Sequence, residues 1–267
     1  MSATPPVVLV IAGSDSGGGA GIQADVRTCA AHRVFPTTAI TAVTAQNTLG
    51  VASVHVVPPE VVAAQVDAVL ADFDVRATKT GMLATAEIIE VVASRAAGAV
   101  LPNLVVDPVM VSASGDRLLE ADAERAYREL LFPSAAVVTP NLREASALVG
   151  RVLSTVADMG EAARELARSG AGAVLVKGGH LDVDVAVDVL WDGVHLHELA
   201  APRVATGNVH GTGCSLASAI AAGLALGHDL VPAVRSAKAF VHRGLEAAAG
   251  WRLGHGHGPI DHFAPGG

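Results

Sequence analysis

The sequence is short of aromatic residues and of cysteines, and each shortage limits what the chain can be. Phe, Trp and Tyr make up 3% of the 267 residues although 51% are hydrophobic, so the core must consist mainly of Ala, Val, Leu and Ile. Such a composition suits parallel strands that are buried on both faces. The two cysteines, Cys29 and Cys214, cannot form a disulfide framework and are not spaced as a metal-binding pair. This favours a reducing, cytoplasmic location.

Basic stripes and long apolar runs are also missing. The net charge is −8, which argues against nucleic acid and an anionic membrane surface as main partners. The apolar run Val7–Ile11 is far shorter than the core of a signal peptide or a membrane span. We therefore expect a soluble protein with no membrane partner and no nucleic-acid partner, whose ligands are small molecules.

Two common nucleotide-binding motifs are absent. The glycine-rich segment 13–21 does not complete G-x-G-x-x-G, because Ile22 stands where the third glycine belongs. No Asp or Glu lies between Asp25 and Glu60 to bind a ribose, and no Gly-Lys-Ser/Thr exists to form a Walker A loop. The segment is then either a loop whose amides approach a flat ligand or only a long connection between a strand and a helix.

Apolar strand patterns alternate with helical patterns along most of the chain, which predicts an α/β fold with a mostly parallel central sheet and helices on both faces. No linker divides the sequence, so we expect one domain over residues 1–267, with a core at about residues 7–250. The Gly-His-Gly-His-Gly run from Gly254 predicts a loop-like tail, which is solvated rather than metal-binding. Strands are expected at 7–11, 37–43, 76–80, 104–107, 136–139, 173–177, 185–191 and 194–199. Helices are expected at 20–33, 59–73, 85–97, 121–131, 141–149, 155–169, 214–226 and 232–248.

Polar residues follow the predicted strands, where ligands bind in open parallel sheets. Gln46 offers one acceptor and two donors, which can match an aminopyrimidine edge. Asp107 and Glu144 come from neighbouring strands, and two such acids could hold Mg²⁺ with ATP. The competing interpretation is local, because Asn141 and Glu144 have the spacing of a helix capping box.

The segment His210-Gly211-Thr212-Gly213-Cys214 opens a predicted helix and is the most informative stretch of the sequence. Free amides at a helix N-terminus form an anion pocket, which suits the charge that develops on a phosphoryl group in transfer. The same field is expected to lower the thiol pKa of Cys214, so that a thiolate could deprotonate an attacking hydroxyl. Alternatively, Cys214 is a small buried residue that packs beneath a helix cap.

The chain has only three lysines, which indicates positions where a compact charge is needed. Lys177 follows an apolar strand, where a phosphate ligand belongs. Lys238 falls on the apolar stripe of the last predicted helix, so it must extend to solvent or meet a negative partner, and it can point to the anion pocket. Lys79 precedes Gly81-Met82 and could serve either purpose.

Taken together, seven segments give the sequence a specific resemblance. They are Gly13–Asp25, Ala45–Asn47, Lys79–Leu83, Asp107–Met110, Thr139–Glu144, Lys177–His180 and His210–Cys214. In this order and spacing the chain closely resembles the hydroxymethylpyrimidine/phosphomethylpyrimidine kinases of thiamine biosynthesis, a ribokinase-superfamily group, from about Val8 to Phe263. The resemblance implies a ribokinase-like three-layer α/β fold, a homodimer, and two successive phosphoryl transfers from Mg²⁺-ATP, first to the hydroxymethyl pyrimidine and then to its monophosphate.

The resemblance also implies a role for each matching residue. The residues implied to bind the pyrimidine are Gly13, Asp25, Gln46, Met82 and Val109. Cys214 would be the base, beside an anion hole of Gly211, Thr212 and Gly213. The residues implied to bind ATP and its metal are Asn141, Lys177 and Lys238 for phosphate and Asp107 and Glu144 for Mg²⁺. Most ribokinase-like relatives have Asp where Cys214 stands, so the cysteine marks this branch.

Three other functions stay open on the sequence alone. A pyridoxine or pyridoxal kinase has the same fold and a similar hydroxymethyl ring. A thiol hydrolase or acyltransferase would use Cys214 as a nucleophile and would need a partner histidine, for which His210 is too close in sequence. A binding module without catalysis is the third.

Overall fold

The computed structural model describes residues 4–110, 123–179 and 185–263, and these residues form one nine-stranded sheet. The strand order is β3-β2-β1-β4-β5-β6-β7-β8-β9. All strands from β2 to β7 in this order run parallel, whereas β3 and β8 are antiparallel to their neighbours. The strands are β1 (Val7–Asp15), β2 (Phe35–Asn47), β3 (Gly50–Val56), β4 (Val75–Thr80), β5 (Leu104–Val106), β6 (Val137–Val138), β7 (Val174–Val176), β8 (Val185–Trp191) and β9 (Leu196–Pro202).

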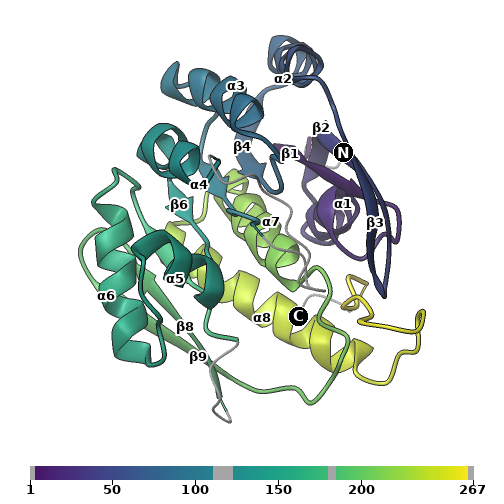
Figure 1. Ribbon diagram of the computed structural model, residues 1–267, viewed down its shortest axis with the longest axis vertical. Coiled ribbons are helices and arrows are strands. Elements are labelled where there is room, and N and C mark those ends of the chain that lie inside the picture. Colours follow the sequence, from purple (N-terminus) through teal and green to yellow (C-terminus); the bar gives the residue numbers. More distant parts are fainter. Residues whose placement is uncertain (1–3, 111–122, 180–184, 264–267) are drawn as a thin grey trace.

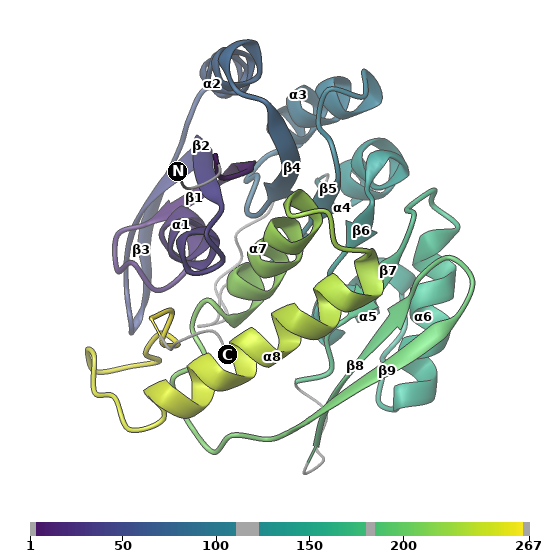
Figure 2. The ribbon, with the colours of Figure 1, turned by 180° about the vertical axis from the view of Figure 1, so that it is seen from behind.

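Helices cover both faces of the sheet, because the central strands are apolar on both sides. Residues Val8 to Ile11 of β1 are completely buried. Figures 1 and 2 show α1, α7 and α8 on one face and the other helices on the opposite face. The helices are α1 (Gly21–Ala31), α2 (Pro59–Asp72), α3 (Ala86–Ala97), α4 (Ala123–Ala126), α5 (Leu142–Val149), α6 (Val156–Ala167), α7 (Thr212–Ala225) and α8 (Leu230–Ala248). This arrangement confirms the predicted three-layer α/β fold.

The hairpin of β2 and β3 is the largest departure from the predicted elements. The expected strand 37–43 extends to Asn47, and β3 was not expected at all. Val54 and most other residues of β3 are exposed on an edge strand, so the strand has no clear alternation of apolar and polar residues. The hairpin matters for the site because the end of its first strand, β2, carries Gln46.

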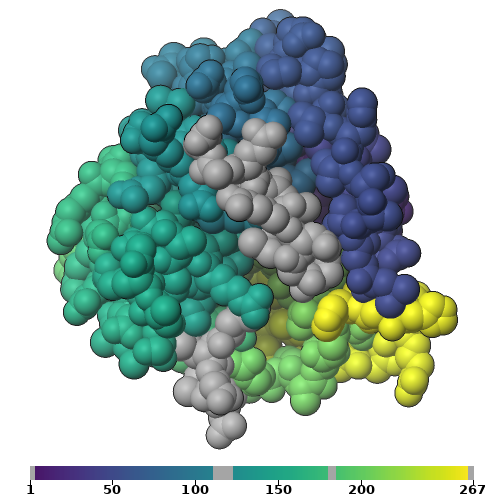
Figure 3. Space-filling model, viewed as in Figure 1, coloured from purple at the N-terminus to yellow at the C-terminus, as the bar shows by residue number. Residues whose placement is uncertain are grey.

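The C-terminal tail was expected to be solvated, and the structure corrects this for residues 258–262 but not for 254–257, which are exposed. Its described residues have no helix or strand, and they pack against the turn of the β2–β3 hairpin (Figure 3) and against the start of α7. The amides of His255 and Gly256 donate to the Thr48 hydroxyl. Ile260 and His262 are 1% and 3% exposed, and the His262 ring bonds to Ser215 at 2.8 Å. Burial of these side chains orders the tail.

Within the described residues, no helix combines the length and the apolar character needed to cross a bilayer.

Candidate active site

A cavity of about 610 Å³ lies beyond the carboxyl ends of the parallel strands. It brings together segments that are far apart in the sequence, as the strand-end rule predicts. Gln46 and Cys214 line the same cavity. The other predicted site residues on its wall are Gly13, Met82, Asp107, Val109, Asn141, Glu144, Lys177, Gly211, Thr212, Gly213 and Lys238.

Asp25 is the exception, and its predicted contact with substrate does not fit its position. Its side chain is completely buried beneath the cavity, where both carboxylate oxygens accept from Lys79 Nζ at 2.9 Å. The Ser218 hydroxyl donates to the same carboxylate at 2.6 Å. Asp25 therefore neutralises a buried lysine and stands behind the site rather than in it. Lys79 itself is completely buried, so of the two roles considered for it, partner of a buried acid is the one observed.

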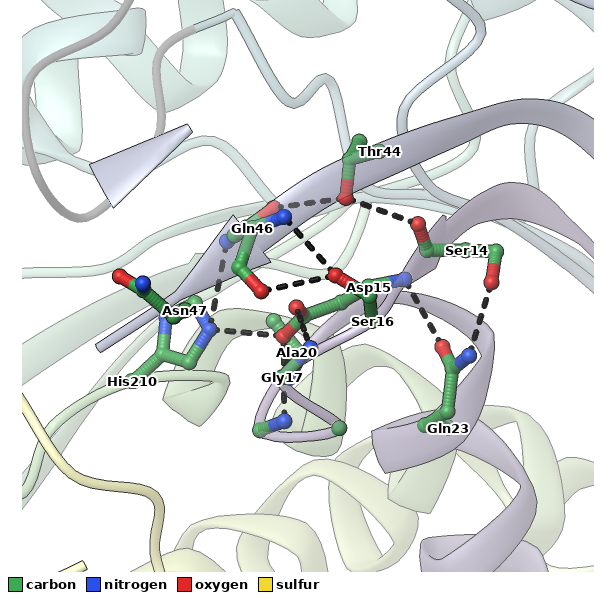
Figure 4. Close-up of polar contacts among 12 residues, drawn as sticks. Ser14, Asp15, Ser16, Gly17, Ala20, Gln23, Thr44, Gln46, Asn47 and His210 are labelled. Atoms are coloured by element: carbon green, nitrogen blue, oxygen red, sulfur yellow. Dashed lines mark hydrogen bonds and ion pairs between the residues drawn. The ribbon is translucent and has the colours of Figure 1, made fainter. Parts of the chain in front are cut away.

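Asp15, the last residue of β1, shapes the glycine-rich loop. Its carboxylate accepts from the amides of Gly17, Gly19 and Ala20 at 2.8 to 3.0 Å, and from the His210 ring at 2.9 Å (Figure 4). Burial raises its pKa, but the hydrogen bonds from His210 and the amides outweigh burial and lower it overall. Asp15 is therefore ionised, and the loop is wrapped around a fixed charge.

Gln46 is held at the other side of this loop. Its backbone exchanges two hydrogen bonds with the Ser16 hydroxyl, at 2.7 and 2.8 Å. Its side-chain amide lies 3.1 Å from the Thr44 hydroxyl and 3.4 Å from the His210 ring (Figure 4). The amide is thus fixed at the cavity wall with hydrogen-bonding capacity left for a ligand.

Helix α7 begins at the cavity wall, where the sequence predicts an anion pocket. Gly211 caps the helix with a φ of +79°, and a Cβ there would collide with the carbonyl oxygen of Gly19. The amide of Thr212 donates to the Val209 carbonyl at 3.3 Å, so its capacity is partly used within the turn. The amides of Gly213 and Cys214 follow in the first turn, where helix geometry provides no intrahelical acceptor. They can donate to an anion in the cavity.

The Cys214 thiol is only partly exposed, at the cavity wall, and its pKa is the opposite of what was expected. Burial raises the pKa to about 11, and the carboxylates of Asp25 and Asp107 act in the same direction. Lys79 lowers it but is itself neutralised by Asp25. The helix-end argument missed this because a buried, acid-rich surrounding is not visible in the local sequence. In the free protein Cys214 is therefore mainly a neutral thiol.

Three charged residues, Lys177, Asp107 and Glu144, lie together on the cavity wall near the first turn of α7. Lys177 Nζ donates to Asp107 Oδ1 at 2.7 Å, and a Cβ at Gly213 would lie 3.2 Å from the same ammonium. Glu144 is 4% exposed, and burial together with the nearby Asp107 raises its pKa to about 7, against the opposing effect of Lys177. Glu144 also closes the capping box with Asn141, with Oε2 accepting from the Asn141 amide at 2.7 Å. The local interpretation of Glu144 is therefore observed, and its role at a metal ion stays a prediction.

Lys238 meets a negative partner, one of the two outcomes expected for it. Its ammonium donates to Asp188 of β8 at 2.7 Å, at the end of the cavity formed by β8, β9 and α8. This end also contains the apolar residues Val204, Val241 and Leu245. The cavity is thus lined by the polar side chain of Gln46, by the first turn of α7 at Gly213, and by apolar side chains next to Lys238.

Sequence analysis missed Asp15 and His210, which hold the loop and the glutamine together. His210 was considered only as a partner for a nucleophilic cysteine, and its hydrogen bond to Asp15 spans 195 positions. The one sequence feature that could have indicated a role for Asp15 was its position between an apolar strand and a glycine-rich run.

The fold and the cavity define a ribokinase-like α/β protein whose cavity is lined by Gln46, by the first turn of α7 and by the residues around Lys238. A profile of the family described as "Phosphomethylpyrimidine kinase" matches residues 15–261. The chain belongs to this family.

Sequence relatives agree with this assignment. The chain is 51% identical over 260 residues to a hydroxymethylpyrimidine/phosphomethylpyrimidine kinase of Rhizobium meliloti, covering 96% of this chain and 97% of that relative. It is also 51% identical over 261 residues to a chloroplastic thiamine biosynthetic bifunctional enzyme of Arabidopsis thaliana. That alignment covers 97% of this chain, which spans only half the length of the plant enzyme.

Solved structures show the same fold. A pyridoxal kinase of Bacillus subtilis, solved as an ADP complex, superposes with a TM-score of 0.90 at 38% identity and covers 98% of both chains. A phosphomethylpyrimidine kinase of Clostridium difficile superposes with a TM-score of 0.79 at 39% identity, covering 89% of this chain and 98% of the other.

Proposed function

We propose that this kinase transfers the γ-phosphoryl group of ATP to 4-amino-5-hydroxymethyl-2-methylpyrimidine and then phosphorylates the monophosphate to the diphosphate. The observation that carries the proposal is the shared cavity of Gln46 and Cys214, with the first amides of α7 between the two cavity ends. Membership of the phosphomethylpyrimidine kinase family supports the substrate class.

In the proposed reaction, the thiolate form of Cys214 takes the proton of the substrate hydroxyl. The hydroxyl oxygen forms a bond to the γ-phosphorus while the bond from that phosphorus to the β–γ bridging oxygen breaks, and ADP leaves. The amides of Gly213 and Cys214 donate to the phosphoryl oxygens, where negative charge is concentrated in the transition state. Lys177 lies next to Gly213 and adds a positive charge at the same place.

The pyrimidine ring is proposed to bind at Gln46, with Gly13, Met82 and Val109 as its apolar walls. Asn141 and Lys238 line the part of the cavity proposed for ATP. The apolar end beside Val241 is proposed to take the adenine.

The oxygen-rich residues next to Lys177 fit a magnesium ion that enters with ATP. Asp107 Oδ1 is occupied by Lys177 and Thr139, whereas both oxygens of Glu144 accept from backbone amides. Asp107 would therefore hold Mg²⁺ through Oδ2, and Glu144 would act through bound water, which suits an ion that keeps several waters. When bound, Mg²⁺ would neutralise charge on the phosphate oxygens.

We also propose one domain, a homodimer and a cytoplasmic location. The single continuous sheet supports one domain. The hairpin of β2 and β3 exposes Val43, Leu49 and Val54, a set of apolar side chains that a second copy could cover. The two free cysteines suit a reducing compartment.

The test is ATP-dependent product formation from the hydroxymethylpyrimidine, its monophosphate and pyridoxine, measured side by side. We expect both pyrimidines to be phosphorylated more efficiently than pyridoxine. A preference for pyridoxine would replace the proposal with the pyridoxal kinase function of the structural neighbours. ADP formation that does not depend on any of the three alcohols would contradict both.

A further inference from the structure

A chain of polar contacts links Asp15, His210 and Gln46 at the pyrimidine end of the cavity (Figure 4). His210 Nε2 lies 2.9 Å from Asp15 Oδ2 and 3.4 Å from the Gln46 amide nitrogen. Asp15 and His210 are 3% and 8% exposed, so water cannot freely replace these partners. In each of these contacts one group must therefore donate a hydrogen and the other must accept it.

The contact with Asp15 decides which ring atom of His210 carries a hydrogen. An ionised carboxylate can only accept, and Asp15 already accepts from three amides. The Nε2 atom of His210 must therefore bear the hydrogen, whether the ring is neutral or charged. That nitrogen then has no lone pair to accept from Gln46, so an amide N–H pointing at it would be a repulsive donor–donor contact. The amide oxygen in the same place is instead attracted to the ring N–H that is already bonded to Asp15.

The other end of the amide leads to the same requirement. The Thr44 hydroxyl lies 2.9 Å from the Ser14 carbonyl and 3.1 Å from the Gln46 amide oxygen, and its one hydrogen cannot serve two acceptors. If the amide nitrogen of Gln46 faces Thr44 instead, it donates to the hydroxyl while the hydroxyl donates to Ser14. The oxygen and nitrogen of a glutamine amide have nearly the same shape, so their partners decide which end is which.

We propose that His210, fixed by Asp15, is a positioning residue that turns the oxygen of the Gln46 amide toward itself and the nitrogen toward Thr44. The inference rests on the proposed pyrimidine substrate and specifies how it is recognised. The Gln46 oxygen accepts from the 4-amino group, and the Gln46 nitrogen donates to the adjacent ring nitrogen. The amino group is therefore on the His210 side of the pocket.

The backbone around His210 keeps its ring in this place. Its amide donates to the Gly258 carbonyl at 3.0 Å, and it forms a β-bridge with Pro259 of the tail. Gly19 of the glycine-rich loop packs directly against the His210 ring, so that a Cβ at Gly19 would collide with it. The ring is clamped between the tail and the glycine-rich loop, which suits a fixed hydrogen-bond donor.

The experiment compares two substrates whose hydrogen-bonding edges are opposite. The 4-amino pyrimidine offers a donor and a ring acceptor, whereas its 4-oxo analogue offers an acceptor and a ring N–H. The measurement is kcat/KM for each with wild type, His210→Leu and His210→Gln. In the wild type we expect at least a hundredfold preference for the amino form, because the reversed edge leaves buried polar groups unpaired.

His210→Leu removes the donor and lets the Gln46 amide rotate, so the preference should fall at least tenfold. His210→Gln places an N–H donor near the position of Nε2 and should restore most of the preference. Thr44→Val removes the other anchor and should also lower the preference, which keeps the test decisive if His210→Leu does not fold. His228→Leu changes an exposed histidine and serves as the matched control.

Equal losses on both substrates, with an unchanged preference in His210→Leu and Thr44→Val, would overturn the positioning role. Failure of the wild type to phosphorylate the amino pyrimidine would instead refute the proposed function, so the two failures are distinguishable.

Discussion

The titration of Cys214 gives the sharpest test of the site. Burial and the neighbouring carboxylates raise the pKa of this thiol to about 11, against an ordinary value of 9.0. A difference of two units corresponds to about 3 kcal/mol opposing ionisation, at about 1.4 kcal/mol for each unit. At pH 8, only about one thiol in a thousand is then ionised. Reactions that need the thiolate should accelerate about tenfold for each pH unit until the pKa is reached.

The assay is alkylation by iodoacetamide between pH 7 and pH 10.5, followed by mass spectrometry. The other cysteine, Cys29, is completely buried and its pKa is raised by burial to about 12, so the label reports Cys214 alone. Cys214→Ala is the control and should remain unlabelled in the native protein. A rate that levels off by pH 9 would show that the buried acids do not control this thiol, and would refute the reasoning. In turnover, Cys214→Ala should lose at least about 100-fold, the low end for removal of a general base.

Three further predictions concern buried charge and backbone strain. Burial and the nearby Arg27 lower the pKa of His262 to about 4. The wild type should therefore lose up to about 3 kcal/mol of stability as the pH falls from 6.5 to 4. His262→Gln should lose less, and thermal unfolding at pH 7 and pH 4.5 measures the difference. Gly211→Ala should lower the free energy of unfolding by about 1–2 kcal/mol because the residue has a positive φ. It should also lower kcat/KM strongly, because the added Cβ would collide with Gly19. Gly227→Ala has the same backbone strain without a collision and should retain activity. Lys79→Met should lower the free energy of unfolding in urea by about 3–5 kcal/mol, because it leaves Asp25 unpaired. A double variant that adds Asp25→Asn should recover part of this loss. Equal losses in the single and double variants would contradict the pairing argument.

Most of the fold could be predicted from the sequence because its strands are short apolar runs that stop at glycine, proline or polar residues. The order of these runs is enough to specify a parallel sheet with helices on both faces. The exposed edge strand β3 gave no such pattern, since an edge strand in water has little apolar periodicity. The tail was misjudged for a related reason, because Ile260 and His262 become buried only through contacts with distant segments.

The location of the site was predictable, but its electrostatics were not. Strand ends meet at one edge of a parallel sheet, so Gln46, Lys177 and Cys214 could be placed together from their positions alone. The pKa of Cys214 and the burial of Asp25 depend on which charges lie behind the visible wall. These charged residues belong to other helices and strands, so the spacing of residues around Cys214 in the sequence does not reveal them.

The bond between the His262 ring and Ser215 ties residues 258–262 to the first turn of α7. None of these residues lines the cavity, yet the helix that they contact begins at its wall. We therefore expect substitutions that free this segment to change turnover from a distance, by loosening the start of α7.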